Sequence, residues 1–99
     1  MSGLADAIAA DARLTILREL ASQTGGRLND QLLRRTLDMY GIRRDRDWIV
    51  TQLRKLEALG AIELQEAGGV LVARISPLGR DHVEERGVIE GVTRPHEAS

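Results

Sequence analysis

A cluster of basic side chains lies between residues 43 and 55, where the acidic residues are Asp45 and Asp47. The members of the cluster are Arg43, Arg44, Arg46, Arg54 and Lys55. Arginine can pair bidentately with guanine or grip a phosphate, whereas lysine is better suited to a phosphate. Thr51 can touch a thymine methyl group or a phosphate. These residue types favour contact with duplex DNA, and the alternative is an ordinary solvated charged face.

A helix over residues 46–59 must position these side chains. Asp45 is a good cap for its start, and Gly60 ends it. Its buried row is Ile49, Leu53 and Leu56, spaced four and then three. Since a helix turns about 100° per residue, the opposite face carries Asp47, Thr51, Arg54, Lys55 and Ala58. The remaining arginines of the cluster crowd the helix start, where free backbone amides also favour an anion.

Two further helices precede this one. The first is expected over residues 3–22, with Ser2 as its cap and apolar residues at helical spacing. The second runs from its cap, Asn29, to Tyr40, and Gly41 suits the left-handed position that follows a helix. Its expected buried stripe consists of Leu32, Leu33, Leu37 and Tyr40.

After Gly60 the hydrophobic period changes from helical to two. Strands beginning at Ile62 and covering Val70 to Ile75 are expected to form a hairpin around Gly68-Gly69. Ser76-Pro77 predicts the start of a short last helix, and an extended arm should follow Arg86. The predicted fold class is mainly α with a small β-hairpin (α+β), in the order α-α-α-β-β-α. It comprises one domain, residues 1–86, and an extended C-terminal arm, residues 87–99.

The segment from Asp45 to Ile62 resembles the recognition helix and first strand of winged helix-turn-helix regulators. The resemblance rests on Leu53, Leu56 and Gly60 followed by Ile62. Ser76-Pro77-Leu78-Gly79-Arg80 resembles the entry to the last helix of the same superfamily. This resemblance implies a winged helix-turn-helix (ArsR-like) fold with the third helix in the major groove of DNA. Metal sensing is not implied, because the chain has no Cys and only two His.

More narrowly, the chain resembles small winged-helix proteins of Mu-like phages and prophages along almost its whole length. The residues that carry this resemblance are Arg13-Leu14-Thr15-Ile16-Leu17-Arg18, Tyr40-Gly41-Ile42-Arg43, Arg46-Asp47, Leu56-Glu57 and Gly91-Val92-Thr93-Arg94-Pro95. The resemblance does not supply a biological role for those phage proteins.

The composition argues against several other classes of function. The chain carries no catalytic constellation, no phosphate-binding loop and no Cys, so we expect neither an enzyme nor a cofactor or metal. His82 is expected to be exposed on the last helix rather than to bind a metal. No signal peptide or membrane span is apparent, which predicts a cytoplasmic protein. No small-molecule effector is evident.

The expected function is sequence-specific binding of duplex DNA, as a transcriptional regulator of (pro)phage type. A formal net charge of -1 and a predicted wing tip, Glu66 to Gly69, without Lys or Arg weigh against it. The alternative is a winged helix that serves as a protein–protein interaction module in phage assembly or packaging. Trp48 could stack on a sugar or a partner, although packing on the preceding helix or the tail is the commoner role for a single Trp.

We also expect a homodimer, because apolar residues are left over on three surfaces. These residues are Leu4, Ile8, Val70, Val72, Val88, Ile89 and Val92. The alternative is that the arm folds back over its own hairpin and covers the valines, which would leave a monomer.

Overall fold

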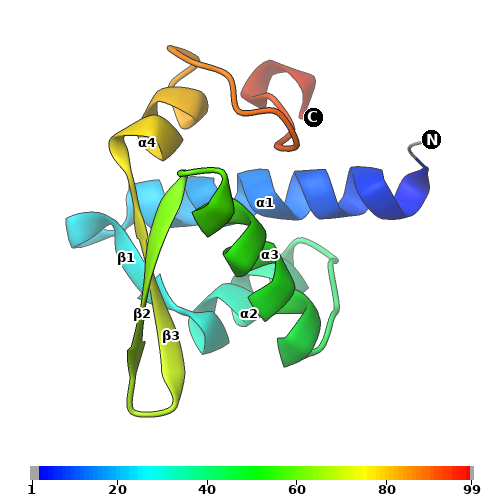
Figure 1. Cartoon of the computed structure of the whole chain (residues 1–99). Coiled ribbons are helices and arrows are strands. Elements are labelled where there is room, and N and C mark those ends of the chain that lie inside the picture. Colours follow the sequence, from blue (N-terminus) through cyan, green and yellow to red (C-terminus); the bar gives the residue numbers. More distant parts are fainter. Residues whose placement is uncertain (1–2, 99) are drawn as a thin grey trace.

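The computed structural model describes residues 3–98, so the predicted cap Ser2 lies outside the described residues. The elements, in chain order, are α1 (Leu4–Ser22), the 3-10 turn η1 (Thr24–Gly26), β1 (Arg27–Asn29), α2 (Asp30–Met39), α3 (Arg46–Ala58), β2 (Ile62–Ala67), β3 (Val70–Ile75), α4 (Pro77–Val83) and the 3-10 turn η2 (Pro95–Glu97). Figure 1 shows α1 crossing above α2 and α3, with the β2–β3 hairpin extending away from it. This arrangement confirms an α+β fold.

The sheet of the described chain has three antiparallel strands in the order β1-β3-β2. The expected hairpin is present, with Ile62 opposite Ile75 and Ala67 opposite Val70. Gly68 and Gly69 both have positive φ, 57° and 84°, as a two-residue hairpin turn requires. The strand β1 was not predicted, so the expected element order was incomplete. Its three residues, Arg-Leu-Asn, are too few to show an alternating pattern, and pairing with β3 makes them a strand.

Side-chain caps begin three of the helices at the predicted residues. The side chain of Asn29 accepts a hydrogen bond from the Leu32 amide at 2.9 Å, and that of Asp45 accepts one from the Trp48 amide at 2.9 Å. Ser76 Oγ accepts from the Gly79 amide at 3.1 Å and donates to the Gly60 carbonyl at 2.6 Å. Each cap satisfies an amide that the helix itself leaves unpaired.

The core is built around α1, which packs against the other helices and β3. Ile49, Leu53 and Leu56 of α3 are fully buried, which confirms the predicted phase of this helix. The predicted stripe of α2 is correct at Leu33 and Leu37.

The α2 stripe was wrong at two other positions, because Leu32 is 40% exposed and Tyr40 is 68% exposed. The buried face of α2 consists of Asp30, Leu33 and Leu37, which recur at intervals of three and four. Leu32 lies beside this face, and Tyr40 is the C-terminal cap where the helix ends. The predicted stripe ran on to Tyr40, one residue beyond the end of α2, and included Leu32, which lies one position before the buried Leu33.

Gly79, in the first turn of α4, lies where no larger residue fits. A Cβ atom built at this position would overlap the carbonyl oxygen of Ala61 and lie 2.9 Å from Ile75 Cγ1. The same Ala61 carbonyl accepts a hydrogen bond from the Ser76 amide at 3.0 Å. The glycine therefore lets α4 pack directly against the backbone that joins α3 to β2.

The C-terminal segment is not the extended arm that was expected. It folds back over α1 and α4, rather than over the hairpin, and ends in η2 (Figure 1). Ile89 and Val92 are 5% and 6% exposed and belong to the hydrophobic core. The Thr93 amide donates to the Ala10 carbonyl at 3.3 Å, and Arg13 Nη1 donates to the Gly91 carbonyl at 2.7 Å. Residues 87–98 thus pack as part of the domain.

His82 holds this segment and was wrongly expected to be exposed. Its side chain is buried, at 1% exposure for the residue. The Ile89 amide donates to Nδ1 at 3.0 Å, so Nδ1 carries no proton and Nε2 donates to the Thr93 carbonyl at 2.9 Å. The ring therefore acts as a neutral bridge between α4 and the C-terminal segment. Nothing in the local sequence indicates this, because both partners are backbone atoms of the returning chain.

Candidate nucleic-acid interface

The outward face of α3 is the candidate interface. The side chains predicted for this face are all exposed: Asp47, Thr51, Arg54, Lys55 and Ala58. In Figure 1, α3 runs along the front of the molecule beside the hairpin. Because the opposite face is filled by Ile49, Leu53 and Leu56, the exposed row cannot turn inward without emptying the core.

Two side chains of this face are held within the helix. Thr51 Oγ1 donates to the Asp47 carbonyl at 2.9 Å, which leaves the hydroxyl oxygen able to accept from outside. Arg54 Nη1 lies 3.4 Å from Glu57 Oε1, one helical turn further on. Both partners are well exposed, so this ion pair contributes little to the stability of the fold. The guanidinium of Arg54 is therefore free to exchange partners.

The turn that leads into α3 carries two more exposed arginines. Arg44 lies over the ring of Trp48, with its guanidinium carbon 5.3 Å from the ring centroid, and its Nη1 donates to the Arg43 carbonyl at 3.0 Å. Trp48 is half-buried and packs against the hydrophobic core. The stacking holds one cation at the N-terminal end of α3, whereas Arg43 extends into solvent without such a support.

Arg46, which was predicted to contact DNA, pairs with a buried carboxylate while its own side chain stays 51% exposed. Its Nε donates to Asp30 Oδ2 at 2.8 Å, and its Nη2 approaches the Gly69 carbonyl at 3.4 Å. The Asp30 side chain is 1% exposed, and its Oδ1 accepts from the Leu71 amide at 3.2 Å. This carboxylate joins the start of α2, the start of α3 and the hairpin. Asp30 could not be recognised from the sequence, since an acidic residue in the first turn of a helix ordinarily complements the helix dipole from the surface.

A second polar link joins the core side of α3 to α1. Arg13 Nε donates to Gln52 Oε1 at 2.9 Å, and the same guanidinium holds the Gly91 carbonyl of the C-terminal segment. Burial lowers the pKa of Arg13 from its ordinary value, and the nearby charge of Asp6 partly opposes this effect. Gln52 is 4% exposed, so α3 is anchored by a buried amide as well as by its apolar row.

The β2–β3 hairpin carries two exposed acidic side chains and one exposed basic side chain. Glu63 and Glu66 are exposed, and Arg74 lies opposite Glu63 in the register of β2 and β3. The exposed cations Arg34 and Arg35 of α2 were not considered as candidates from the sequence.

Within residues 3–98, His, Asp and Glu form no cluster that could hold a metal ion, and no helix is long and apolar enough to cross a bilayer.

The residues expected at a dimer interface fall into three different environments. Leu4 is 77% exposed and Ile8 half-buried at the free end of α1. Val70 and Val72 are half-buried, and Val88 is 54% exposed. Ile89 and Val92, as described above, are covered by the chain's own core and offer no surface to a second copy. Of the three residues expected on the C-terminal segment, Val88 is therefore the one that remains exposed.

The chain is thus a small α+β protein in which the exposed face of α3 carries the cations Arg54 and Lys55. The chain is 31% identical over 90 residues to gp26 of Escherichia phage Mu, described as an uncharacterized protein. The alignment covers 91% of this chain and 93% of gp26. The chain therefore belongs to the gp26 family. No model of a protein family and no solved structure matches it.

Proposed function

We propose that this chain is a winged helix-turn-helix protein that binds duplex DNA sequence-specifically, as a transcriptional regulator of phage type. The element order α1-β1-α2-α3-β2-β3-α4 supports the winged-helix assignment, with β2 and β3 as the wing. In this proposal α2 and α3 form the helix-turn-helix, and α3 enters the major groove.

The observation that carries the proposal is the exposure of Thr51, Arg54 and Lys55 on one face of α3. Arg54 is suited to a guanine edge, whereas Lys55 and Arg43 are suited to phosphates. Arg44, supported by the Trp48 ring, adds a cation at the start of the helix. Arg46 contributes to this face indirectly, because its bond to Asp30 holds α3 in place.

Fluorescence anisotropy with a randomised duplex library, followed by selected sequences, tests the proposal. Binding should be measurable at low salt and should weaken with a linear dependence on the logarithm of the salt concentration. The matched control is Arg94→Ala, an exposed arginine of the C-terminal segment. If no duplex binds at low salt, or if Arg94→Ala weakens binding as much as Arg54→Ala, the assignment of α3 as the reading helix is wrong.

A protein–protein interaction module, acting in phage assembly or packaging, is the second candidate. The acidic hairpin favours it, since Glu63 and Glu66 would repel the DNA backbone wherever the wing approached it. The net charge of -1 points the same way. Absence of duplex binding by a folded protein would favour this candidate.

A further inference from the structure

The solvent-facing side of α1 has the spacing of a helix-pairing seam. Successive residues along it are separated by intervals of four, three, four, three and four. They are Leu4, Ile8, Asp11, Thr15, Arg18 and Ser22. All are exposed or half-buried, and none belongs to the hydrophobic core. Alternating intervals of three and four are those by which two helices pack along their lengths.

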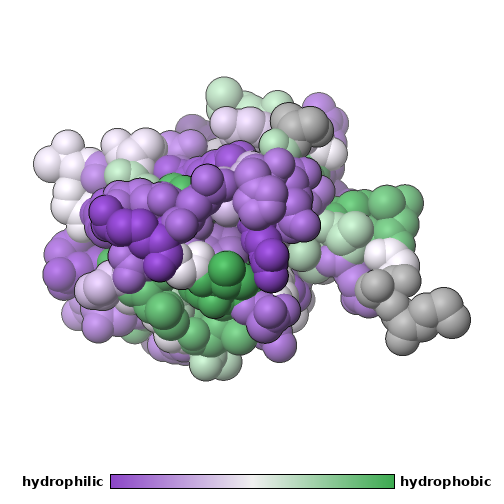
Figure 2. Space-filling view, turned by 90° about the horizontal axis from the view of Figure 1, so that it is seen from above, coloured by the Kyte–Doolittle hydropathy of each residue, from purple (hydrophilic) through white to green (hydrophobic). Residues whose placement is uncertain are grey.

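The N-terminal end of this seam is apolar and unsupported. Figure 1 shows the first turns of α1 projecting beyond the rest of the molecule, and Figure 2 shows hydrophobic surface on this projection. Leu4 is 77% exposed there, and Ile8 is half-buried. Ala5 and Ala9 complete these first turns with small side chains that allow another helix to come close.

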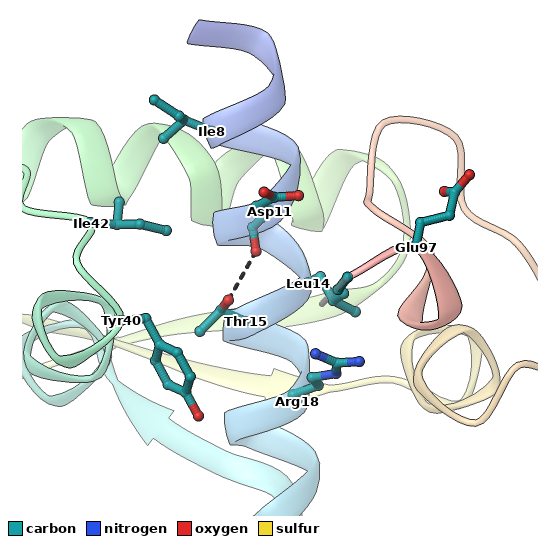
Figure 3. A pocket seen from close by; sticks show the side chains of 9 residues that line it. Ile8, Asp11, Leu14, Thr15, Arg18, Tyr40, Ile42 and Glu97 are labelled. Carbon is teal, nitrogen blue, oxygen red and sulfur yellow. Dashed lines mark hydrogen bonds between the residues drawn. The ribbon is translucent and has the colours of Figure 1, made fainter. Parts of the chain in front are cut away.

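The middle of the same seam forms the floor of a groove. Figure 3 shows α1 running between Tyr40 and Ile42 on one side and Glu97 on the other. The groove has a volume of about 320 Å³. A second hollow of about 200 Å³ continues beside Tyr40 towards Ser22. Tyr40 is 68% exposed, so its ring offers apolar surface to whatever lies in this groove.

We propose that a second copy of this chain occupies the groove, with the two α1 helices antiparallel about a two-fold axis. The apolar end of one helix then lies over the C-terminal half of the other. Leu4 faces Ser22 of the partner subunit beside that subunit's Tyr40, Ile8 faces Arg18 of the partner subunit, and Asp11 faces Thr15 of the partner subunit. The same contacts recur on the other side of the axis, as a closed dimer requires.

Charge complementarity supports a second copy as the occupant. In this register Asp11 and Arg18 of the partner subunit are one helical turn apart across the seam, and the pair occurs twice. Thr93 Oγ1 donates to Asp11 Oδ1 at 2.5 Å, which leaves Oδ2 for the cation. Antiparallel alignment also brings opposite helix dipoles together. A parallel alignment would instead place Asp11 against Asp11 and Arg18 against Arg18.

The outer face of the sheet is less suited to this role. Val70 and Val72 lie there among polar residues, and the surrounding surface is lined by Arg27, Glu63, Gln65 and Arg74. Val88 is an isolated exposed residue beside the charged side chains of Glu85 and Arg94. The end of α1 projects instead beyond the rest of the molecule, and a groove of about 320 Å³ lies along the same helix.

Cross-linking tests the register directly, because the chain has no native cysteine. Leu4→Cys and Ser22→Cys variants are prepared separately and then mixed with a short bis-maleimide. The mixture should give a covalent dimer in several-fold higher yield than either variant alone. Equal yields from Leu4→Cys alone and from the mixture would overturn the antiparallel register.

Sedimentation equilibrium of the full chain tests the dimer itself. A dimer is expected at tens of micromolar, and Leu4→Glu should raise its Kd at least about tenfold. Leu78→Glu, at a site 46% exposed on α4, is the matched control and should have no such effect. Arg18→Asp should weaken the dimer, and Asp11→Arg in the same chain should restore part of it. A monomeric full-length chain, or a dimer insensitive to Leu4→Glu, would overturn the proposal, and neither result would bear on DNA binding by α3.

Discussion

The guanidinium of Arg46 lies 2.8 Å from the carboxylate of Asp30, and this ion pair joins the starts of α3 and α2. The Asp30 side chain is 1% exposed and that of Arg46 is 51% exposed, so one charge is buried and the other is partly hydrated. Removal of the arginine would leave a buried carboxylate with the Leu71 amide as its remaining partner in the described structure.

Arg46→Ala should therefore lower the free energy of unfolding by about 1–3 kcal/mol, the range for a buried group that loses a charged partner. Urea denaturation monitored by circular dichroism measures the change. Arg43→Ala, at an exposed arginine in the preceding turn, is the control and should stay within about 0.5 kcal/mol of the parent. Equal stability of the two variants would show that the Asp30–Arg46 pair does not hold α3.

Leu53→Ala should lower the free energy of unfolding by about 2–5 kcal/mol, as truncations of buried leucines do. Leu53 is fully buried between α1 and the other core elements, so the deleted atoms leave a cavity. Thermal melting provides the measurement. Leu32→Ala, at a leucine of α2 that is 40% exposed, is the comparison and should lower the free energy of unfolding by less. A melting temperature unchanged by Leu53→Ala would contradict the phase assigned to α3.

His82→Leu should loosen residues 87–98. The substitution removes the acceptor for the Ile89 amide and the donor to the Thr93 carbonyl, and each buried group left unpaired costs about 1–3 kcal/mol. Limited proteolysis with trypsin should then cut after Arg86 faster than in the parent chain. Glu90→Gln, at an exposed residue of the same segment, is the control and should leave the rate unchanged. Equal rates for His82→Leu and the parent would show that the ring does not retain the segment.

Gly79→Ala should destabilise the protein by about 1–3 kcal/mol, because an added methyl group in a packed region forces its neighbours apart. The neighbour here is the Ala61 carbonyl, a backbone atom that cannot rotate away. Gly87→Ala is a matched control, since its Cβ would meet Asp81 Cβ at an ordinary 3.5 Å. Chemical denaturation of both variants compares them, and the same loss in each would contradict the close approach at Gly79.

Two arginines should affect DNA binding in different ways. Arg54→Ala should weaken the free energy of binding to a selected duplex by about 1–3 kcal/mol, and it should relax the base preference at one position of that duplex. Arg43→Ala should weaken binding to every sequence and reduce the slope of the salt dependence by about one. Anisotropy titrations with selected and scrambled duplexes at several salt concentrations measure both effects. An Arg54→Ala variant that loses the same affinity for both duplexes would show that this residue contacts phosphate rather than a base.

The sequence alone determined the features that depend on neighbouring residues. The caps Asn29, Asp45 and Ser76 satisfy amides only three residues away, so their helix starts could be located without the fold. The buried row of α3 follows from helical periodicity, and the hairpin follows from Gly68-Gly69 between two alternating segments. The exposed face of α3 was predictable for the same reason, since it is the side that the buried row leaves free.

The tertiary structure decided the features whose partners are distant along the chain. β1 exists because β3 pairs with it, and Asp30 is buried because Arg46 and the Leu71 amide meet it there. His82 lies in the core because the segment after Arg86 turns back and places two backbone groups against its ring. From its neighbours in the sequence alone, a polar residue is predicted to lie at the surface. Whether it is buried depends on partners that the fold brings to it, since burial without them would cost more than the fold could offset.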